Sequence, residues 1–324
     1  MKKIMVAGGG GFIGGWLVKE LLERGHQVTS VDIKPIDQWH QVFNQAVNLT
    51  RDLSKLEFCL ETTRGIDHVY NLAADMGGMG FIENNKAVCM LSVLINTHLL
   101  VASKKNGVLN YFFASSACVY NAEKQSQTLN DPLKEEDAYP AMPEDGYGWE
   151  KLFSERMCRH FYEDYGLETR VARYHNVYGP NGTWDGGREK APAALCRKIA
   201  KAKVSSNKSI EIWGDGEQTR SFTYIEDCIK GSIMLMNSDV REPLNVGSSE
   251  MVSINSMVEI IESIAGVKIT RKYNLEAPKG VRGRNSDNTR IQNLLNWQPS
   301  ILLSTGLSAT YKWIEEQVNS HNGN

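Results

Sequence analysis

A tyrosine and a lysine four residues apart have the types and spacing that proton transfer from an alcohol needs. Tyr147 and Lys151 share one face if a helix begins at Tyr147. A phenol is a poor base at neutral pH because its pKa is about 10, and an adjacent ammonium favours the phenolate. The phenolate could then remove a hydroxyl proton as hydride leaves carbon. Alone, this spacing is more often a surface pair, so its interpretation depends on what surrounds it.

A strand that ends in small polar residues gives this pair its context. Residues 113–118 read Phe-Ala-Ser-Ser-Ala-Cys, which predicts a strand with hydroxyl groups at its carboxyl end. Ligands of open α/β sheets bind at such strand ends. We therefore expect Ser116 to hydrogen-bond the substrate hydroxyl that Tyr147 deprotonates.

A cysteine and a second lysine form a further candidate acid/base pair. Cys118 lies three residues past the predicted strand, beside Ser116, and Lys190 precedes a predicted helix, where a cation is slightly unfavourable for the helix dipole. Thiols and ammonium groups have ordinary pKa values of about 8.5 and about 10.4, and burial or mutual proximity can move either towards neutrality. The alternatives are a small buried hydrophobe at Cys118 and a solvated cation at Lys190.

A glycine-rich segment near the N-terminus predicts a dinucleotide site. The run Gly8-Gly9-Gly10-Gly11-Phe12-Ile13-Gly14 follows a predicted strand and opens a predicted helix. Residues without side chains let the backbone approach a pyrophosphate, whose charge the helix N-terminus stabilises. Asp32 ends the second strand, where its carboxylate can bind both ribose hydroxyls and would repel a 2′-phosphate. This favours NAD over NADP, although Lys34 leaves some NADP tolerance open. Asp52 and Leu53 are candidates for contact with the edge of the adenine ring.

The first half alternates short β-branched runs with longer amphipathic ones, a pattern typical of a parallel sheet covered by helices on both faces. We predict strands at 4–7, 27–32, 68–72, 111–115 and 169–173. We predict helices at 12–24 and 82–105, and from about 147, from about 191 and near 308–320. The expected fold class is α/β, a Rossmann-type doubly wound parallel sheet with a smaller C-terminal substrate-binding domain. Residues 1–174 would form the NAD-binding domain, with about 219–248 returning to it, and 175–324 would be mainly substrate-binding.

Composition excludes several classes of protein. The 324 residues are 41% hydrophobic and 23% charged with a formal net charge of −2, whereas nucleic-acid binders normally carry a basic surplus. The six cysteines form no C-x-x-C pair, so we expect neither a metal site nor a disulfide framework. The glycines at 8–11 argue against a signal peptide, and no segment approaches the roughly 20 apolar residues of a membrane span. We expect a cytoplasmic protein that binds neither nucleic acid nor membrane.

These motifs together resemble the extended short-chain dehydrogenase/reductase superfamily and its NAD-dependent epimerase/dehydratase family. They include the glycine loop, Ser115-Ser116, the Tyr147/Lys151 pair and Asn-Val-Tyr-Gly-Pro at 176–180. Longer strings at 71–80, 115–118, 186–192, 213–220 and 281–288 are similar to the GDP-mannose 3,5-epimerase family. This resemblance spans nearly the whole chain.

The resemblance implies NAD, a GDP-hexose substrate and transient oxidation at C4, with Cys118 and Lys190 as acid and base at C3 and C5. A ketone at C4 would lower the pKa of both neighbouring C–H bonds, so one acid and one base can invert each centre. The implied reaction converts GDP-mannose to GDP-L-galactose, with GDP-L-gulose as a further product. A homodimer packed through helices 82–105 and 147–165 is also implied.

The expected site residues fall into three sets, with no metal ligands among them. The catalytic set is Cys118, Lys190, Tyr147, Lys151 and Ser116. The cofactor set is Gly8, Gly11, Phe12, Ile13, Gly14, Asp32, Asp52, Leu53, Ala73, Tyr147 and Lys151. The substrate set is Gly77, Gly78, Ser116, Ala117, Cys118, Tyr147, Asn176, Glu189, Lys190, Ala191, Lys198, Gln218, Arg220 and Arg282. Within the last set, Lys198, Arg220 and Arg282 are candidates for the diphosphate, as is Arg188.

Three alternatives stay open. A GDP-4-keto-6-deoxymannose epimerase/reductase of the GDP-fucose synthase type also pairs a cysteine with Y-x-x-x-K. That family usually has histidine at the position of Lys190 and consumes NADPH, so Lys190 and Asp32 count against it. Another nucleotide-sugar epimerase is the second alternative, although a plain 4-epimerase leaves Cys118 and Lys190 unexplained. A catalytically silent dinucleotide-binding scaffold is the third, and the intact reactive residues disfavour it.

Overall fold

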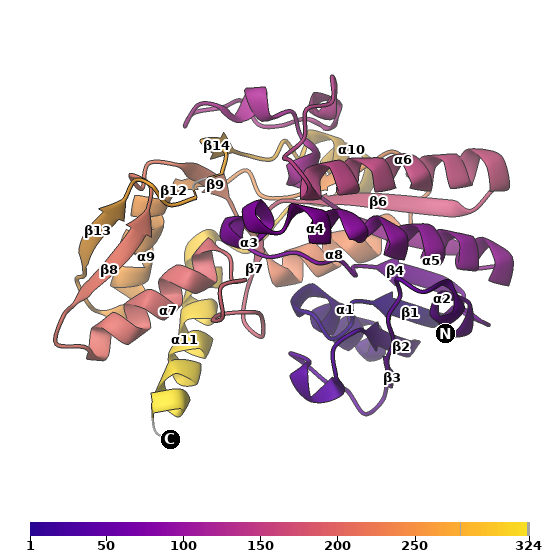
Figure 1. Ribbon diagram of the computed structural model, residues 1–324, viewed down its shortest axis with the longest axis horizontal. Helices are drawn as coiled ribbons and strands as arrows, with labels where there is room; N and C mark the ends of the chain where they lie inside the picture. The colour runs from indigo at the N-terminus through magenta and orange to yellow at the C-terminus, as the bar shows by residue number, and fades with distance from the viewer. Residues whose placement is uncertain (279, 323–324) are drawn as a thin grey trace.

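A seven-stranded sheet forms the core of the larger part of the molecule, on the right in Figure 1. In this computed structural model, which describes residues 1–278 and 280–322, the strand order is β11-β6-β5-β4-β1-β2-β3 and every pairing is parallel. The strands are β1 (Lys3–Ala7), β2 (Gln27–Asp32), β3 (Val47–Thr50), β4 (His68–Asn71), β5 (Asn110–Ser116), β6 (Glu168–Tyr174) and β11 (Leu244–Val246). The order reverses between β1 and β4, and ligands of doubly wound sheets bind at such a switch point.

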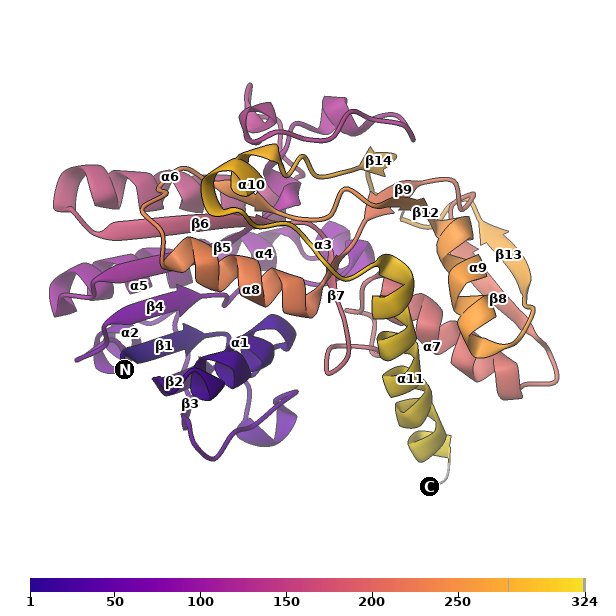
Figure 2. The same cartoon turned by 180° about the vertical axis from the view of Figure 1, so that it is seen from behind.

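Helices cover both faces of this sheet. One face carries α1 (Phe12–Glu23) and α8 (Ile225–Met236), which lie in front of the sheet in Figure 2. The other carries α2 (Leu56–Thr62), α5 (Val93–Asn106) and α6 (Tyr147–Tyr165). Alternate residues of β1 enter the two cores, since Ile4 and Val6 pack on the α1 side and Met5 and Ala7 on the α5 side. The predicted α/β fold class is confirmed.

The smaller C-terminal part sits beside the carboxyl ends of the strands (Figures 1 and 2). Its helices α7 (Ala191–Val204), α9 (Ile254–Ala265) and α11 (Leu303–Asn322) pack on one another. Short strands in the second half of the chain form three small sheets: β7 (Val177–Tyr178) pairs with β10 (Thr223–Tyr224), β8 (Ser209–Trp213) with β13 (Thr270–Asn274), and β9 (Thr219–Ser221) with β12 (Met251–Ser253) and β14 (Gly283–Arg284). The remaining helix, α10 (Thr289–Leu295), lies against β11. The domain boundary expected at residue 174 stays a prediction.

The predicted helix at 82–105 is wrong as a single element. The chain instead forms α3 (Met79–Asn84), α4 (Lys86–Leu91) and α5, with interruptions at Asn85 and Ser92. The Asn85 side chain donates to the Phe81 carbonyl, and the Ser92 hydroxyl accepts from the backbone N–H of Asp75. Asparagine and serine compete with backbone hydrogen bonds in this way, which apolar periodicity does not register.

One segment is more apolar than we expected from the sequence. Lys86–Asn106, which comprises α4 and α5, contains an 18-residue window with a mean hydropathy of 1.5 and is long enough to cross a bilayer. The expectation that no segment approaches such a composition is therefore wrong. The core helix of a water-soluble protein can have the same length and composition, and 39% of that window is buried within the chain. The cytoplasmic location stays a prediction.

Candidate active site

Tyr147 and Lys151 lie next to each other at the start of α6. Tyr147 is its first residue, and the Lys151 ammonium lies 5.5 Å from the centre of the Tyr147 ring and 4.7 Å from that of Phe113 in β5. Both reactive side chains are buried. The Lys151 ammonium is also 3.5 Å from the Glu150 carboxylate. The spacing of four residues therefore does place both groups on one buried face.

Helix α6 is fixed against the sheet by a buried ion pair. Arg173 in β6 donates to both carboxylate oxygens of Glu155, at 2.9 and 2.7 Å, and the Ser115 hydroxyl donates to the same carboxylate at 2.5 Å. Near the start of the helix, a Cβ at Gly148 would lie 2.3 Å from the Cys118 carbonyl oxygen. Only glycine lets the helix come this close, so the first turn of α6 packs directly on the turn that carries Cys118.

The end of β5 presents the serine and cysteine of the predicted site. A 3₁₀ turn over Ala117–Val119 follows the strand, and the Ser116 hydroxyl caps it by accepting from the Cys118 N–H at 3.2 Å. Burial, and then the proximity of Cys118, raise the pKa of Tyr147 well above its ordinary value, while the Ser116 hydroxyl opposes this by hydrogen-bonding the phenol. Tyr147 is therefore a neutral phenol here, in hydrogen-bonding reach of Ser116.

Cys118 is surrounded by charged side chains from three other segments. Arg284 in β14 places Nη1 3.7 Å from the Cys118 sulfur and pairs through Nη2 with Glu144, in the loop before α6. Burial, followed by Glu144, raises the pKa of Cys118 to about 11, and Arg284 works in the opposite direction. Lys190 lies close enough that Cys118, Glu144 and Arg284 all act on its pKa, which is lowered mainly by burial.

Lys190 is the residue before α7, and the loop leading to it is tightly held. The N–H of Gly78 donates to the Arg188 carbonyl at 3.0 Å, and a Cβ at Gly78 would lie 2.6 Å from the Glu189 carbonyl oxygen. The Glu189 carboxylate accepts from Arg197 at 2.5 Å and from the Gly187 N–H at 2.7 Å. Glu189, predicted at the substrate, thus uses both oxygens to order the loop. Gly77, which precedes Gly78, and Ala191, which follows Lys190, lie on either side of the contact between these two loops.

The glycine loop has the close backbone packing that the sequence predicted. Gly8 has a φ of +81°, and the N–H groups of Gly8 and Gly9 both donate to the Val31 carbonyl. A Cβ at Gly14 would lie 2.0 Å from the Gly8 carbonyl oxygen. Helix α1 begins at Phe12 with no side-chain cap and no acidic residue in its first turn. Its first amides, including that of Ile13, therefore have no side-chain cap from the described part of the chain and are suited to an anion.

Asp32 is placed at the edge of this loop. Its carboxylate accepts from the Gly10 N–H and from the Lys34 N–H, each at 3.1 Å. The Asp32 carbonyl accepts from the backbone N–H of Arg51, so the loop that carries Asp52 and Leu53 lies next to Asp32. Leu53 is buried, and the Asp52 carboxylate accepts from the Ser54 N–H. Ala73 closes the other side, because its nitrogen would be 2.9 Å from a Cβ on Gly8.

The other predicted substrate residues are only partly brought to the site. Arg220 lies near Arg284 and Glu144, whose charges act on its pKa. The Asn176 amide donates to the Ser221 carbonyl, and Gln218 keeps a buried side-chain oxygen without a hydrogen bond from the described residues. Lys198 donates instead to the Glu211 carbonyl, Arg282 pairs with Asp215 at 2.8 Å, and Arg188 stacks on Phe81.

The structure adds two site residues that our sequence analysis did not select, Arg284 and Glu144. Arg284 stands in the string at 281–288, where Arg282 was chosen instead. The two arginines are two residues apart around Gly283, and nothing in their spacing says which one turns inward. Glu144 lies three residues before Tyr147, and this proximity in the chain was its only signal.

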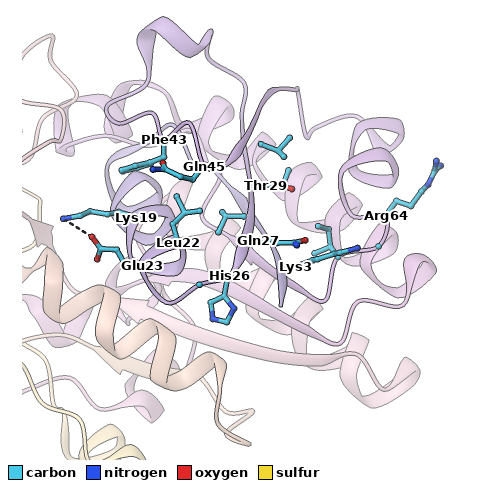
Figure 3. Close-up of a pocket in the computed structure, with 15 residues that line it drawn as sticks. Lys3, Lys19, Leu22, Glu23, His26, Gln27, Thr29, Phe43, Gln45 and Arg64 are labelled. Atoms are coloured by element: carbon cyan, nitrogen blue, oxygen red, sulfur yellow. Dashed lines mark ion pairs between the residues drawn. The ribbon is translucent and has the colours of Figure 1, made fainter. Parts of the chain in front are cut away.

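A cavity of about 780 Å³ opens at the opposite edge of the sheet (Figure 3). Its lining includes Lys3 and Gln27, at the amino ends of β1 and β2, together with Lys19, Phe43 and Arg64. None of the predicted site residues lines it. Because parallel sheets bind their ligands at the carboxyl ends of strands, this cavity is not the candidate active site despite its volume.

Comparison with known proteins agrees with this geometry. Residues 4–247 match the model of the NAD dependent epimerase/dehydratase family. The chain is 48% identical to GDP-mannose 3,5-epimerase of Arabidopsis thaliana and 49% identical to GDP-mannose 3,5-epimerase 1 of Oryza sativa subsp. japonica. Each alignment covers 98% of this chain, and 83% and 82% of the relatives.

Solved structures of related enzymes share the fold. UDP-glucuronic acid 4-epimerase from Bacillus cereus, in complex with UDP-glucuronic acid and NAD, superposes with a TM-score of 0.84 at 25% identity over 97% of this chain and 99% of that one. UDP-glucose 4-epimerase from Thermotoga maritima, with UDP-glucose, has a TM-score of 0.87 at 24% identity, over 98% and 99%. The chain therefore belongs to the NAD-dependent epimerase/dehydratase family.

Proposed function

We propose that this chain is a GDP-mannose 3,5-epimerase that converts GDP-mannose to GDP-L-galactose, with GDP-L-gulose as a product of incomplete inversion. The observation that carries the proposal is the convergence of Cys118 and Lys190 beside Tyr147 at the end of β5. An enzyme that inverts only C4 needs Tyr147 and Lys151 but has no use for a second acid/base pair. The names of the relatives at 48% and 49% identity support the same reaction.

The reaction begins with the loss of a proton from the C4 hydroxyl. Tyr147 accepts that proton, Ser116 orients the hydroxyl, and Lys151 holds positive charge close to the phenol ring. NAD, when bound, supplies the oxidation of C4 and its later re-reduction. Because the neutral phenol is favoured by burial, we expect Tyr147 to act as a base only when positive charge is brought to it.

Inversion at C3 and C5 follows from the acidity of carbons beside a ketone. One of Cys118 and Lys190 removes a proton, and the other returns one to the opposite face. The negative charge that develops on the enolate oxygen meets Lys190, Arg220 and Arg284, and fixed positive groups stabilise such charge without rearranging. The same cations suit an anionic nucleotide-sugar. Lys198 and Arg282 are further candidates for the diphosphate.

We place NAD on the glycine loop, with the pyrophosphate at the first amides of α1 and the adenosine ribose at Asp32. In Gly14→Ala, the added Cβ would meet the Gly8 carbonyl at 2.0 Å, a contact that only a backbone shift can relieve. We expect calorimetry to show NAD affinity weakened at least about tenfold. The control, Gly15→Ala, places a Cβ 3.0 Å from Nε2 and 3.2 Å from Cβ of Gln41, which are side-chain atoms and not backbone, and should bind NAD normally. Equal affinities in the two variants would contradict this placement.

The reaction itself is tested by isotope exchange. Purified protein incubated with GDP-mannose in heavy water should incorporate deuterium at C3 and C5 and form GDP-L-galactose without added cofactor. NMR and mass spectrometry of the product locate the label. UDP-glucose is the control, because a plain 4-epimerase would convert it without carbon-bound deuterium. Absence of exchange at both carbons of GDP-mannose excludes the proposed reaction.

The role of Cys118 is tested by Cys118→Ser. A hydroxyl is a much weaker acid than a thiol, so we expect deuterium exchange at C3 and C5 to fall at least about a hundredfold. Oxidation at C4 should persist, and borodeuteride added at quenching would trap the 4-keto sugar with label at C4. Cys89→Ser, a matched change in the same apolar cluster, should retain exchange. If exchange at both carbons survives in Cys118→Ser, the cysteine is structural.

We also propose a homodimer built on α4 and α6. These helices pack on each other and leave apolar side chains exposed, among them Leu91, Phe153 and Trp149. Contiguous exposed apolar surface marks interaction sites. Light scattering should give twice the mass of the chain for the native protein and the monomer mass for the double variant Leu91→Glu/Phe153→Glu. The control Leu109→Glu changes a leucine of equal exposure elsewhere, 59% against 60%, and should stay dimeric. A monomeric native protein would refute the proposal.

A further inference from the structure

Glu144 is a buried carboxylate fastened to the turn that carries Cys118. Its N–H donates to the Cys118 carbonyl at 3.0 Å, so the loop before α6 is joined directly to the turn after β5. Its side chain is only 11% exposed, and one carboxylate oxygen accepts from Arg284. A buried carboxylate is costly unless it is paired, and Arg284 provides that pairing.

Arg284 touches the thiol and the carboxylate with different nitrogens of one rigid plane. Nη1 lies 3.7 Å from the Cys118 sulfur, Nη2 pairs with Glu144, and Nε donates to Gln125 at 2.6 Å. Gln125 is itself buried and fixed by two backbone carbonyls. Since a guanidinium is planar, these three contacts set its position relative to the sulfur.

The second carboxylate oxygen of Glu144, Oε2, lies in the same buried cluster, in which Arg284 contacts both Glu144 and the Cys118 sulfur. It is buried and has no hydrogen bond of good geometry from the described residues, yet Glu144 and the Cys118 thiol act on each other's pKa as hydrogen-bond partners. An unsatisfied buried acceptor costs free energy, and the thiol proton can satisfy it. Burial opposes ionisation of Glu144, but Arg284, with smaller contributions from Cys118 and Arg220, holds the carboxyl pKa below its ordinary value.

The charged and titratable groups around Cys118 come from several elements. Glu144 precedes α6, Tyr147 opens α6, Lys190 precedes α7, and the cations Arg220 and Arg284 come from β9 and β14. Among these groups, Glu144 is the anion. The proton affinity of the thiol therefore depends on one carboxylate set against three cations.

We propose that Glu144 and Arg284 are positioning residues for Cys118: Glu144 accepts the hydrogen bond of the thiol, and Arg284 stabilises the thiolate. When Cys118 protonates a sugar carbon, the S–H bond breaks, its electron pair stays on sulfur beside Arg284, and a C–H bond forms. When Cys118 removes a proton, a C–H bond breaks into the enolate and the S–H bond reforms towards Glu144. This proposal rests on the proposed 3,5-epimerase function.

Thiol alkylation tests the proposal without any sugar. The rate of reaction of the full-length protein with iodoacetamide is measured against pH for wild type, Glu144→Gln, Glu144→Asp and Asp145→Asn. Cys118→Ser supplies the background from the other five cysteines, all of which are buried. Asp145→Asn is the matched control, since it removes a neighbouring carboxylate that pairs with Lys86 on the surface. Circular dichroism and the thermal midpoint establish that each variant is folded.

Removing the charge of Glu144 leaves Arg284 unopposed beside the sulfur, so the thiolate becomes more stable. In Glu144→Gln we expect the alkylation midpoint to fall by at least about one pH unit, which is a tenfold gain in thiolate below the midpoint. The alkylation midpoint of Glu144→Asp should return towards the wild-type value, and that of Asp145→Asn should equal the wild-type value. A Glu144→Gln profile that coincides with wild type overturns the proposal.

The consequence for catalysis is measured on the same variants. In Glu144→Gln, deuterium exchange at C3 and C5 should fall at least about tenfold, whereas borodeuteride trapping of the 4-keto sugar should change by less than about threefold. Equal losses of exchange and trapping, or unchanged exchange, overturn the positioning role. If wild type itself exchanges no deuterium with GDP-mannose, the proposed function fails, and the alkylation profile still decides whether Glu144 controls the thiol.

Discussion

The buried ion pair between Glu155 and Arg173 is the contact on which the geometry of the site depends. It joins α6 to β6, and the hydroxyl of Ser115 binds the same carboxylate from β5. Separating two buried charges leaves each of them unpaired at a cost of several kcal/mol, so the helix cannot slide along the strands. The first turn of α6 is therefore held where Gly148 meets the Cys118 carbonyl.

The position of α6 on the sheet brings a redox group and an acid/base group to the carboxyl end of β5. The thiol of Cys118 is close enough to the phenol of Tyr147 to raise the pKa of that phenol. Lys190 and Arg284 arrive from the C-terminal part of the chain, which packs over the carboxyl ends of the strands. A site that oxidises one carbon and inverts its neighbours needs such an arrangement, because the ketone and the acid/base groups must act on the same ring.

Local patterns in the sequence predicted much of the fold. The five predicted strands match β1, β2, β4, β5 and β6 to within one residue, since apolar alternation and flanking turns are encoded nearby in the chain. The interruptions at Asn85 and Ser92 were missed because they arise from side-chain hydrogen bonds, which leave the apolar pattern unchanged.

The candidate site was predictable only where its members lie close in sequence or in a familiar motif. Tyr147 and Lys151 are four residues apart, and the spacing alone puts them on one face. The contact between Arg284 and Cys118 joins residues 166 apart, so no local pattern could select Arg284 over Arg282. Glu189 was expected at the substrate because of its motif, yet its partner Arg197 engages it within the loop.

In the proposed reaction, Cys118 and Lys190 act on opposite faces of a sugar whose C4 hydroxyl is held by Tyr147. A crystal structure with NAD and GDP-mannose bound measures this directly. We expect the Tyr147 oxygen within about 3.2 Å of the C4 hydroxyl, and the Cys118 sulfur and Lys190 nitrogen on opposite faces of the ring next to C3 or C5. A sugar bound with C4 turned away from Tyr147, or with both groups on one face, would contradict the account.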